Sequence, residues 1–477
     1  GIPGAPKVKM GKSLDYFRRL EKKVLGNKTL KKWVGELYLE YHRGTYTSQA
    51  YNKKTNRHLE LKLAQIEWLS SLAYVLGGEY AQKELQDSWE CVLLHQFHDI
   101  IPGSSIHEVY QDSKVNYKAA KDRADQVKDR ALKVLTKEEE NTWSIYSTNS
   151  FGGNELVLIP VMDMGVFTNE QGEILDAQQT ENGYLISVDV KPFAVTMVQF
   201  QLADMQIELI PFHLNGNHLE TPYYKIEWNK NGQLCQIYDK EAKRQVLRDG
   251  ELGNVLEIYE DKPMNYDAWD IDIYYVQKMQ MAKIIKEPEV VEMGDLQCVI
   301  RFTYNYHLST IVQDMVVYRD SRRIDFRTKV DWQETQKLLK TAFYTDIHAV
   351  KATYDIQFGH AERPTHWNTS WDWARFEVCS HKWADLSEQG YGVSLLNTCK
   401  YGHSIKDHAM KLSLLKSAIH PDTTADKGLH EFTYSLLAHM GSFIEGKTIE
   451  EANQLNLPAQ AVKGRFKDTR KLVEIRK

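Results

Sequence analysis

The sequence is poor in cysteine and contains no paired cysteine motif. Its 477 residues include five cysteines, and no two of them are separated by only two residues. An odd number of scattered cysteines argues against a disulfide framework and against a cysteine-based zinc site. We therefore expect the protein to work in a reducing compartment, the cytoplasm.

Long apolar runs and a strong charge of one sign are also lacking. No stretch reaches the roughly 20 apolar residues that span a bilayer, and the start, Gly1-Ile2-Pro3, has neither an initiator Met nor the apolar core of a signal peptide. The net charge of -5 and a pI near 6.4 give no electrostatic reason to expect nucleic acid or an anionic membrane as partner. We expect neither partner, and we expect the sequence to begin within a longer polypeptide.

What the sequence does contain is a change of periodicity. From about residue 13 to residue 136, apolar residues recur at helical spacing. After the charged residues 137–140, alternation takes over, as in residues 184–190, with turns marked by Asn-Gly pairs. The pattern predicts an α+β protein in which a helical region, similar to a three-helix bundle, precedes a large antiparallel β-sandwich, because parallel strands would need crossover helices.

One short run combines a metal-capable side chain with a carboxylate. His98 and Asp99 follow a predicted helix on which Cys91, His95 and His98 would share one stripe. Such a stripe resembles a metal cluster, but a partly buried helix face explains it equally simply, and the structural explanation is favoured. Pro102-Gly103 should stop the helix just beyond Asp99, which places that carboxylate at the unfavourable negative end of the helix dipole. A ligand or metal that needs the carboxylate would offset that cost, and a nearby lysine or arginine would do so equally well.

Three further segments mix aromatic and polar side chains. A pyranose ring shows both C–H faces and hydroxyl edges, so this mixture suits a sugar site. Helix caps and the packing of a β-sandwich use the same residue types, and the sequence alone leaves both explanations open. The segments are residues 33–49, residues 266–270 and residues 359–377.

Taken together and in order, these segments resemble the α-mannosidases of glycoside hydrolase family 38, most closely the cytosolic branch. The similarity covers nearly the whole chain. The segments that carry it are residues 33–57, His95-Gln96-Phe97-His98-Asp99, Asp267-Ala268-Trp269-Asp270, residues 354–377, residues 396–402 and His430-Glu431-Phe432-Thr433-Tyr434.

The resemblance implies a retaining exo-α-mannosidase that holds one divalent metal, zinc or, in the cytosolic branch, cobalt. Retaining glycosidases use two carboxylates about 5–5.5 Å apart, one as nucleophile and one as acid and then base. In the matching motif the histidine binds the metal and the aspartate binds the sugar, which gives these roles to His98 and Asp99. His95 is not required by the motif. The family's aromatic sugar contact falls at Trp269.

Other parts of the family's centre have no match. Its H-x-D motif, its nucleophile and its acid/base residue belong to an N-terminal barrel, whereas His420-Pro421-Asp422 lies late in the β region. We therefore expect no catalytic residue in this chain and no hydrolysis by the chain alone. Weaker candidates for walls of the sugar site are His42, His366, Asn368, Asp372 and Arg375.

The resemblance also implies a division of the chain and a set of partners. We expect a linker and first helix in residues 1–30, a helical middle domain in 31–137, a small β domain in 138–220 and a central β-supersandwich in 221–477 that is truncated at its end. The expected partner is a mannose-containing oligosaccharide, and we expect a homo-oligomer. The competing hypothesis is a non-catalytic carbohydrate-binding or assembly module.

Overall fold

The computed structural model describes residues 3–204 and 210–467, and the chain forms two compact units, Gly1–Leu39 and Glu40–Lys477. The first unit contains α1 (Ser13–Val24), which has no buried residue. The other helices and strands belong to the second unit. No helix of the described residues is long and apolar enough to cross a membrane.

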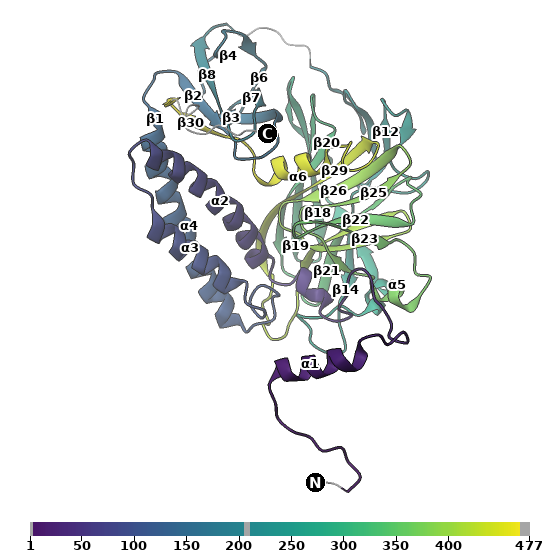
Figure 1. Cartoon of the computed structure of the whole chain (residues 1–477). Helices are drawn as coiled ribbons and strands as arrows, with labels where there is room; N and C mark the ends of the chain where they lie inside the picture. The colour runs from purple at the N-terminus through teal and green to yellow at the C-terminus, as the bar shows by residue number, and fades with distance from the viewer. Residues whose placement is uncertain (1–2, 205–209, 468–477) are drawn as a thin grey trace. The chain divides into compact units, whose positions relative to one another are not determined.

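Three long helices lie side by side after a short 3-10 turn (Figure 1). These elements are η1 (Arg43–Tyr46), α2 (Ala50–Val75), α3 (Gln82–His95) and α4 (His107–Leu135). Their shared core contains Leu59, Leu63 and Ile66 of α2, each fully buried, because the 3.6-residue period gathers these side chains on one face. Gly77, at a φ of +89°, follows Leu76, the C-cap residue of α2. The predicted helical region is confirmed.

A small β region follows the helices. Two sheets, in the orders β30-β2-β8-β4-β5 and β3-β7-β6, share one apolar core that includes Ile159, Phe167 and Ile186. The strands are β2 (Thr142–Tyr146), β3 (Gly153–Ile159), β4 (Gly165–Asn169), β5 (Ile174–Leu175), β6 (Ala177–Thr180), β7 (Gly183–Val190), β8 (Val195–Leu202) and β30 (Gln460–Lys463).

The large β region contains three sheets among the described residues, and their strands pair antiparallel throughout. The ten-stranded sheet is built from β16 (Lys283–Ile284), β17 (Glu289–Met293), β18 (Gln297–Tyr306), β19 (Ser309–Tyr318), β20 (Arg323–Trp332), β22 (Lys351–Ile356), β23 (Gly359–Pro364), β25 (Trp383–Glu388), β26 (Tyr391–Asn397) and β29 (Gly428–Met440). The six-stranded sheet is built from β14 (Val255–Glu260), β15 (Met279–Met281), β21 (Lys337–Tyr344), β24 (Val378–Cys379), β27 (Gly402–Lys406) and β28 (Ala409–Lys416). The five-stranded sheet is built from β9 (His213–Asn215), β10 (His218–Glu220), β11 (Tyr224–Trp228), β12 (Leu234–Asp239) and β13 (Arg244–Gln245).

The ten-stranded and six-stranded sheets share an aromatic core. Phe326 of β20 packs against Phe343 of β21 with ring centroids 5.7 Å apart, and against Tyr434 of β29 at 5.2 Å. Aromatic pairs at these separations contribute about 0.5–1.5 kcal/mol beyond their area burial. The α+β class, with a helical region before antiparallel sheets, is therefore confirmed.

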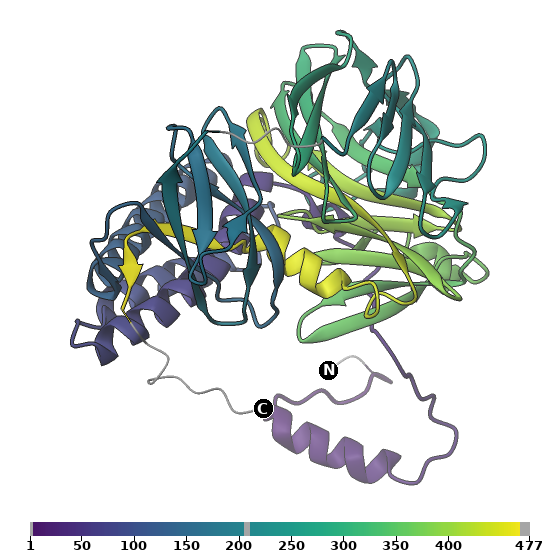
Figure 2. The ribbon, with the colours of Figure 1, turned by 90° about the horizontal axis from the view of Figure 1, so that it is seen from above.

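Two features of the β region differ from the sequence prediction. The sequence predicts β structure after residues 137–140, yet α6 (Thr448–Asn456) forms and buries Ala452 against Trp383 and Leu437. The predicted division assigned residues 460–466 to the large β region, whereas β30 pairs with β2, and β31 (Arg465–Phe466) pairs with β1 (Thr136–Lys137). Figure 2 shows this yellow segment running from α6 back to the small β region. One nine-residue helix and two short strands carry too few residues for periodicity to reveal them.

Candidate functional site

His98 and Asp99 lie in a turn-rich connection, residues 96–106, between α3 and α4. Their side chains are 77% and 40% exposed, and His98 Nε2 lies 3.4 Å from Asp99 Oδ2. The helix ends at His95, so the prediction that Asp99 occupies its last turn is wrong. The backbone N–H of Phe97 already donates to the carbonyl of Leu94, three residues back, which breaks the α-helical ladder well before Pro102.

The stripe of three candidate metal ligands does not form, because His98 is off the helix. His95 is buried, its ring lies 4.4 Å from that of Tyr117, and its Nδ1 is 2.6 Å from the carbonyl oxygen of Cys91. This arrangement is that of a histidine packed inside a helical bundle. His95 and Cys91 therefore serve structure, and His98 remains as the exposed imidazole.

The connection that carries Asp99 is tied down from two sides. The carbonyl of Asp99 accepts a hydrogen bond of 2.6 Å from the Ser105 hydroxyl. The ammonium of Lys53, on α2, donates to the carbonyl of Ile101 at 2.8 Å and also to the carbonyl of Ser48. Burial lowers the pKa of Lys53 to about 7, although Asp426 opposes the shift. The backbone on either side of Asp99 is thus held while its side chain faces solvent.

The residues before α2 also contact the candidate segment at residues 266–270. The His42 and Trp269 rings meet edge to face with centroids 4.2 Å apart. The backbone N–H of His42 donates to Asp270 Oδ1 at 2.8 Å, and that of Gly44 donates to the Trp269 carbonyl at 2.8 Å. The partly exposed Trp269 ring is thereby fixed beside His42.

Ser48 connects the two candidate segments. Its hydroxyl donates to the carbonyl of Ala268 at 2.6 Å. Its Cβ and carbonyl also face Gly103, where an added methyl group would lie 2.6 Å from both. The turn at residues 42–49 therefore contacts both the connection that carries Asp99 and the segment that carries Trp269.

Beneath this turn lies a buried ion pair. The Lys416 ammonium is 2.6 Å from Asp261 Oδ2, both side chains are essentially inaccessible, and the same ammonium donates to the Asp267 carbonyl at 2.6 Å. Burial raises the pKa of Asp261, although the facing ammonium acts in the opposite direction. The pair anchors the segment that presents Trp269.

The remaining candidates belong to a separate helix cap. Thr369 and Asp372 form a capping box at α5 (Ser370–Ala374), and His366 Nδ1 lies 3.6 Å from Asp372 Oδ2. The backbone N–H of Asn368 donates to His366 Nδ1 at 3.4 Å, and Arg375 is the C-cap residue. Within residues 3–204 and 210–467, no hydrogen bond joins His366, Asn368 or Asp372 to the connection that carries Asp99.

The α5 turn is nevertheless attached to η1. The Arg43 guanidinium donates to the carbonyl of Ala374 at 2.8 Å and lies 4.4 Å from the centre of the Phe376 ring. Sequence reasoning gave no role to Arg43, Lys53 or Asp270, although all three lie in or beside segments it singled out. The available signal for Arg43 and Lys53 was that two cations lie ten residues apart, next to a turn that contains a glycine. The sequence does not show that these cations are buried.

The side chains at this site can supply part of the ligand set of a zinc or cobalt ion. The His98 imidazole is an ordinary ligand for either metal, and the neighbouring Asp99 carboxylate adds an oxygen donor. In the part of the chain that the structure describes, no group of three or more His, Cys, Asp or Glu side chains is placed to share a metal. His98 is thus a fitting single ligand.

Comparison with known families identifies both regions of the chain. Residues 40–135 match the alpha mannosidase middle domain, and residues 219–424 match the C-terminal domain of glycosyl hydrolases family 38. The chain belongs to glycoside hydrolase family 38. The resemblance drawn from the sequence motifs is confirmed.

Relatives of this family 38 chain are named α-mannosidases. Alpha-mannosidase G of Dictyostelium discoideum is 35% identical over 95% of this chain and 45% of its own length. Alpha-mannosidase 2C1 of Homo sapiens is 33% identical over 96% of this chain and 43% of its own length. The chain therefore spans less than half of these relatives. A crystal structure of an α-mannosidase from Enterococcus faecalis V583 has a TM-score of 0.79 at 15% identity, covering 96% of this chain and 62% of that chain, which shows a shared fold.

Proposed function

We propose that this family 38 chain forms part of a retaining exo-α-mannosidase that removes terminal α-linked mannose from oligosaccharides. The observation that carries the proposal is the exposed His98–Asp99 pair on a tethered connection beside the His42–Trp269 contact. A glycosidase needs polar groups for sugar hydroxyls next to an aromatic surface for the C–H face. The names of the relatives support α-mannose as the sugar.

Each candidate residue has a role in this proposal. Asp99 accepts hydrogen bonds from mannose hydroxyls, since an ionised carboxylate is an acceptor only. Trp269 presents its ring to the sugar, and His42 holds that ring edge to face. His98 binds the metal through its imidazole. The α5 turn with His366, Asn368, Asp372 and Arg375 forms an outer wall through its Arg43 attachment.

The metal is zinc, with cobalt as the alternative. When bound, it supplies a Lewis acid that orients and polarises sugar hydroxyls. The proposal assigns neither the nucleophile nor the acid/base residue to this chain, because the family places both in a barrel for which this sequence has no matching motif. Metal dependence and retention of anomeric configuration are part of the proposal.

The test compares variants in the longest natural polypeptide that contains this chain. We expect His98→Ala to lower bound metal, measured by mass spectrometry, together with kcat/KM for an aryl α-mannoside. Asp99→Asn should keep the metal and raise KM. Full metal content in His98→Ala would refute the ligand assignment.

A matched control exists for this test. His348 and Asp346 form a second exposed pair, with side chains 75% and 39% exposed and 4.0 Å between Nε2 and Oδ1. His348→Ala removes an equally exposed imidazole beside a carboxylate, yet we expect unchanged metal content and activity. If metal content and activity fell as much as in His98→Ala, the loss of any exposed imidazole would explain the result, and not the loss of His98 in particular.

A carbohydrate-binding module is the second candidate function. Trp371 and Trp373 on α5 are 57% and 46% exposed, as expected for aromatic platforms that stack on glycans. Calorimetric titration of the 477-residue chain with mannose oligosaccharides separates the two proposals. Binding that Trp371→Ala abolishes and Asp99→Asn leaves intact would favour the module, and the reverse would favour the mannosidase site.

We further propose a reducing compartment, the cytoplasm, and a homo-oligomeric assembly. All five cysteines carry free thiols, and Cys235 is exposed, as suits a chain that is kept reduced.

The proposed homo-oligomer is supported by the family resemblance. Light scattering on the purified protein gives its mass, and a monomer would refute this part.

A further inference from the structure

The motif His420-Pro421-Asp422 lies in the connection between β28 and β29, residues 417–427. This connection runs from the six-stranded sheet to the ten-stranded sheet. Two of its carboxylates are buried, since Asp422 and Asp426 are only 5% and 6% exposed. Buried carboxylates need hydrogen-bond donors, so the donors that they meet show which elements the connection holds.

The connection supports the segment that carries Trp269. The backbone N–H of Ala268 donates to the carbonyl of His420 at 3.1 Å. Ala418 and Ala425 form a buried apolar cluster with Ala268, and Trp269 packs against this cluster. The connection therefore holds the Trp269 segment through both a backbone hydrogen bond and side-chain packing.

The carboxylate of Asp426 holds the start of α2. Its two oxygens accept hydrogen bonds, each of 2.7 Å, from the backbone N–H groups of Gln49 and Ala50. The first N–H groups of a helix have no partner within the helix, and the helix dipole favours a negative charge at this end. Asp426 thereby attaches the connection to the turn at residues 42–49.

The carboxylate of Asp422 joins two further groups to the connection. Its Oδ2 accepts a hydrogen bond of 2.9 Å from the side-chain amide of Gln49. Its Oδ1 lies 3.1 Å from Nδ1 of His107, the first residue of α4, and accepts a hydrogen bond of 2.9 Å from the backbone N–H of Thr424. Burial acts to raise the pKa of Asp422, but these hydrogen bonds lower it below its ordinary value. Asp422 is therefore an ionised acceptor at neutral pH.

These contacts reach every element that carries a candidate sugar-binding residue. His107 directly follows the connection that carries Asp99. Gln49 ends the turn that begins at His42, and the His42 ring lies 4.2 Å from the ring of Trp269. One carboxylate thus holds two of these elements, and it stands on the segment that supports the third.

We propose that Asp422 is a positioning residue, which keeps Asp99, His42 and Trp269 at a fixed spacing for one bound sugar. The inference rests on the proposed mannosidase function for the identity of the sugar. Asp422 acts through the side chains that it holds, because it is itself buried. Groups that bind the same ligand lose much of their effect when their spacing changes by about 1 Å.

Hydrogen exchange in the 477-residue chain tests the positioning role without any need for activity. Asp422→Ala removes the carboxylate, and we expect amide exchange to rise about tenfold in both residues 96–106 and residues 266–270, because both segments lose an attachment. His107→Leu changes a side chain that is 45% exposed, so folding is not at risk. It removes only the contact with α4 and should raise exchange in residues 96–106 alone. Unchanged exchange in either segment of Asp422→Ala would overturn the proposal.

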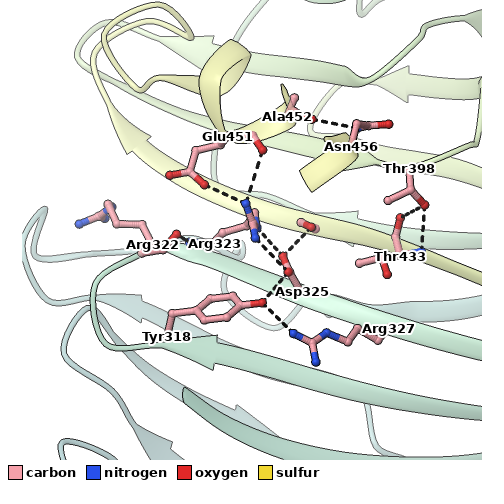
Figure 3. A network of polar contacts seen from close by, with 12 residues as sticks. Tyr318, Arg322, Arg323, Asp325, Arg327, Thr398, Thr433, Glu451, Ala452 and Asn456 are labelled. Atoms are coloured by element: carbon pink, nitrogen blue, oxygen red, sulfur yellow. Dashed lines mark hydrogen bonds and ion pairs between the residues drawn. The ribbon is translucent and has the colours of Figure 1, made fainter. Parts of the chain in front are cut away.

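A carboxylate in another network supplies the matched control. Figure 3 shows Glu451 of α6, whose Oε2 accepts a hydrogen bond of 3.0 Å from Arg323 of β20. Arg323 also donates to Asp325 Oδ1 at 2.6 Å, so Glu451→Ala leaves the guanidinium paired. Among the described residues, no hydrogen bond of Glu451 reaches residues 417–427. We expect Glu451→Ala to keep the parent's exchange in both segments, and a rise equal to that of Asp422→Ala would overturn the proposal.

Kinetics in the longest natural polypeptide that contains this chain measures the effect on the proposed reaction. We expect Asp422→Ala to raise KM for an aryl α-mannoside about tenfold and to change kcat less than about twofold, because sugar-binding groups are displaced. Asp422→Asn should recover most of the parent's KM. Its amide oxygen still accepts from His107, and the Gln49 amide can turn to accept from the new amide. A KM in Asp422→Asn as high as in Asp422→Ala would contradict the role of these hydrogen bonds.

Failure of the proposed function gives a different result from failure of this inference. A parent polypeptide that hydrolyses no α-mannoside refutes the mannosidase assignment, and hydrogen exchange then decides alone whether Asp422 holds the two segments. If the parent hydrolyses the mannoside while Asp422→Ala keeps the parent's exchange and KM, the positioning role is refuted and the function stands.

Discussion

The ammonium of Lys53 lies 2.8 Å from the carbonyl oxygen of Ile101, across 48 residues of sequence, and also donates to the carbonyl of Ser48. This one buried cation fastens the connection that carries Asp99 to the start of α2. The exposed end of the candidate site is therefore held by a buried residue of α2.

Replacing Lys53 tests this tether. Lys53→Met keeps the length of the side chain but leaves the buried carbonyl of Ser48 and the partly buried carbonyl of Ile101 without their donor. A buried group left unpaired costs about 1–3 kcal/mol. We expect amide hydrogen exchange in residues 97–105 to rise at least tenfold. Lys54→Met is the control, because that ammonium donates to the Glu431 carbonyl at an exposed position. Equal exchange in the two variants would show that Lys53 does not hold the connection.

The same lysine predicts a dependence of stability on pH. Its folded-state pKa is about 7, below the value of about 10.4 for an unperturbed lysine. Between these values the unfolded chain binds the extra proton, so stability should rise with pH, by at most about 1.4 kcal/mol per pH unit. Urea unfolding between pH 7 and pH 9 measures this slope. The slope should be shallower in Lys53→Met, and an identical slope in both proteins would contradict the assignment.

Gly103 offers a separate test of how closely the connection packs. Its φ is +90° and an added methyl group would lie 2.6 Å from Ser48, whereas Gly77, with a φ of +89°, has open space around it. Gly77→Ala should therefore lower the free energy of unfolding only through its strained backbone conformation, by about 1–2 kcal/mol. We expect Gly103→Ala to cost at least about 1 kcal/mol more, because the clash adds the cost of overpacking. Chemical unfolding of both variants measures the difference, and equal losses would rule out the close packing.

The buried Lys416–Asp261 pair under the Trp269 segment should contribute more to the free energy of unfolding than a surface ion pair does. Lys416→Met leaves the Asp261 carboxylate buried without its cation, which typically costs about 3–5 kcal/mol. Lys83→Met breaks an exposed pair with Asp87 and should cost less than about 1 kcal/mol. Urea unfolding at pH 7 compares the two. A small loss in Lys416→Met would mean that Asp261 takes up a proton or water replaces the ammonium.

The fold class followed from local periodicity, whereas the candidate site followed only in part. His98 and Asp99 were identified as adjacent residues in the sequence, and both of their side chains are exposed in the structure. The helix end was predicted at least four residues too late, because Pro102 marks where a helix must have stopped and not where the ladder breaks. His366, Asn368 and Asp372 are residue types that suit a sugar site, yet their contacts belong to a helix cap.

The sequence by itself determined the fold class and the family. Helical spacing defined the middle region, alternation defined the sheets, and the ordered motifs indicated the family. Only the tertiary structure decided which candidates meet. Ser48 reaches Ala268 across 220 residues, and β30 returns to β2, because long-range hydrogen bonds and buried charges such as Lys53 depend on packing that no local pattern records.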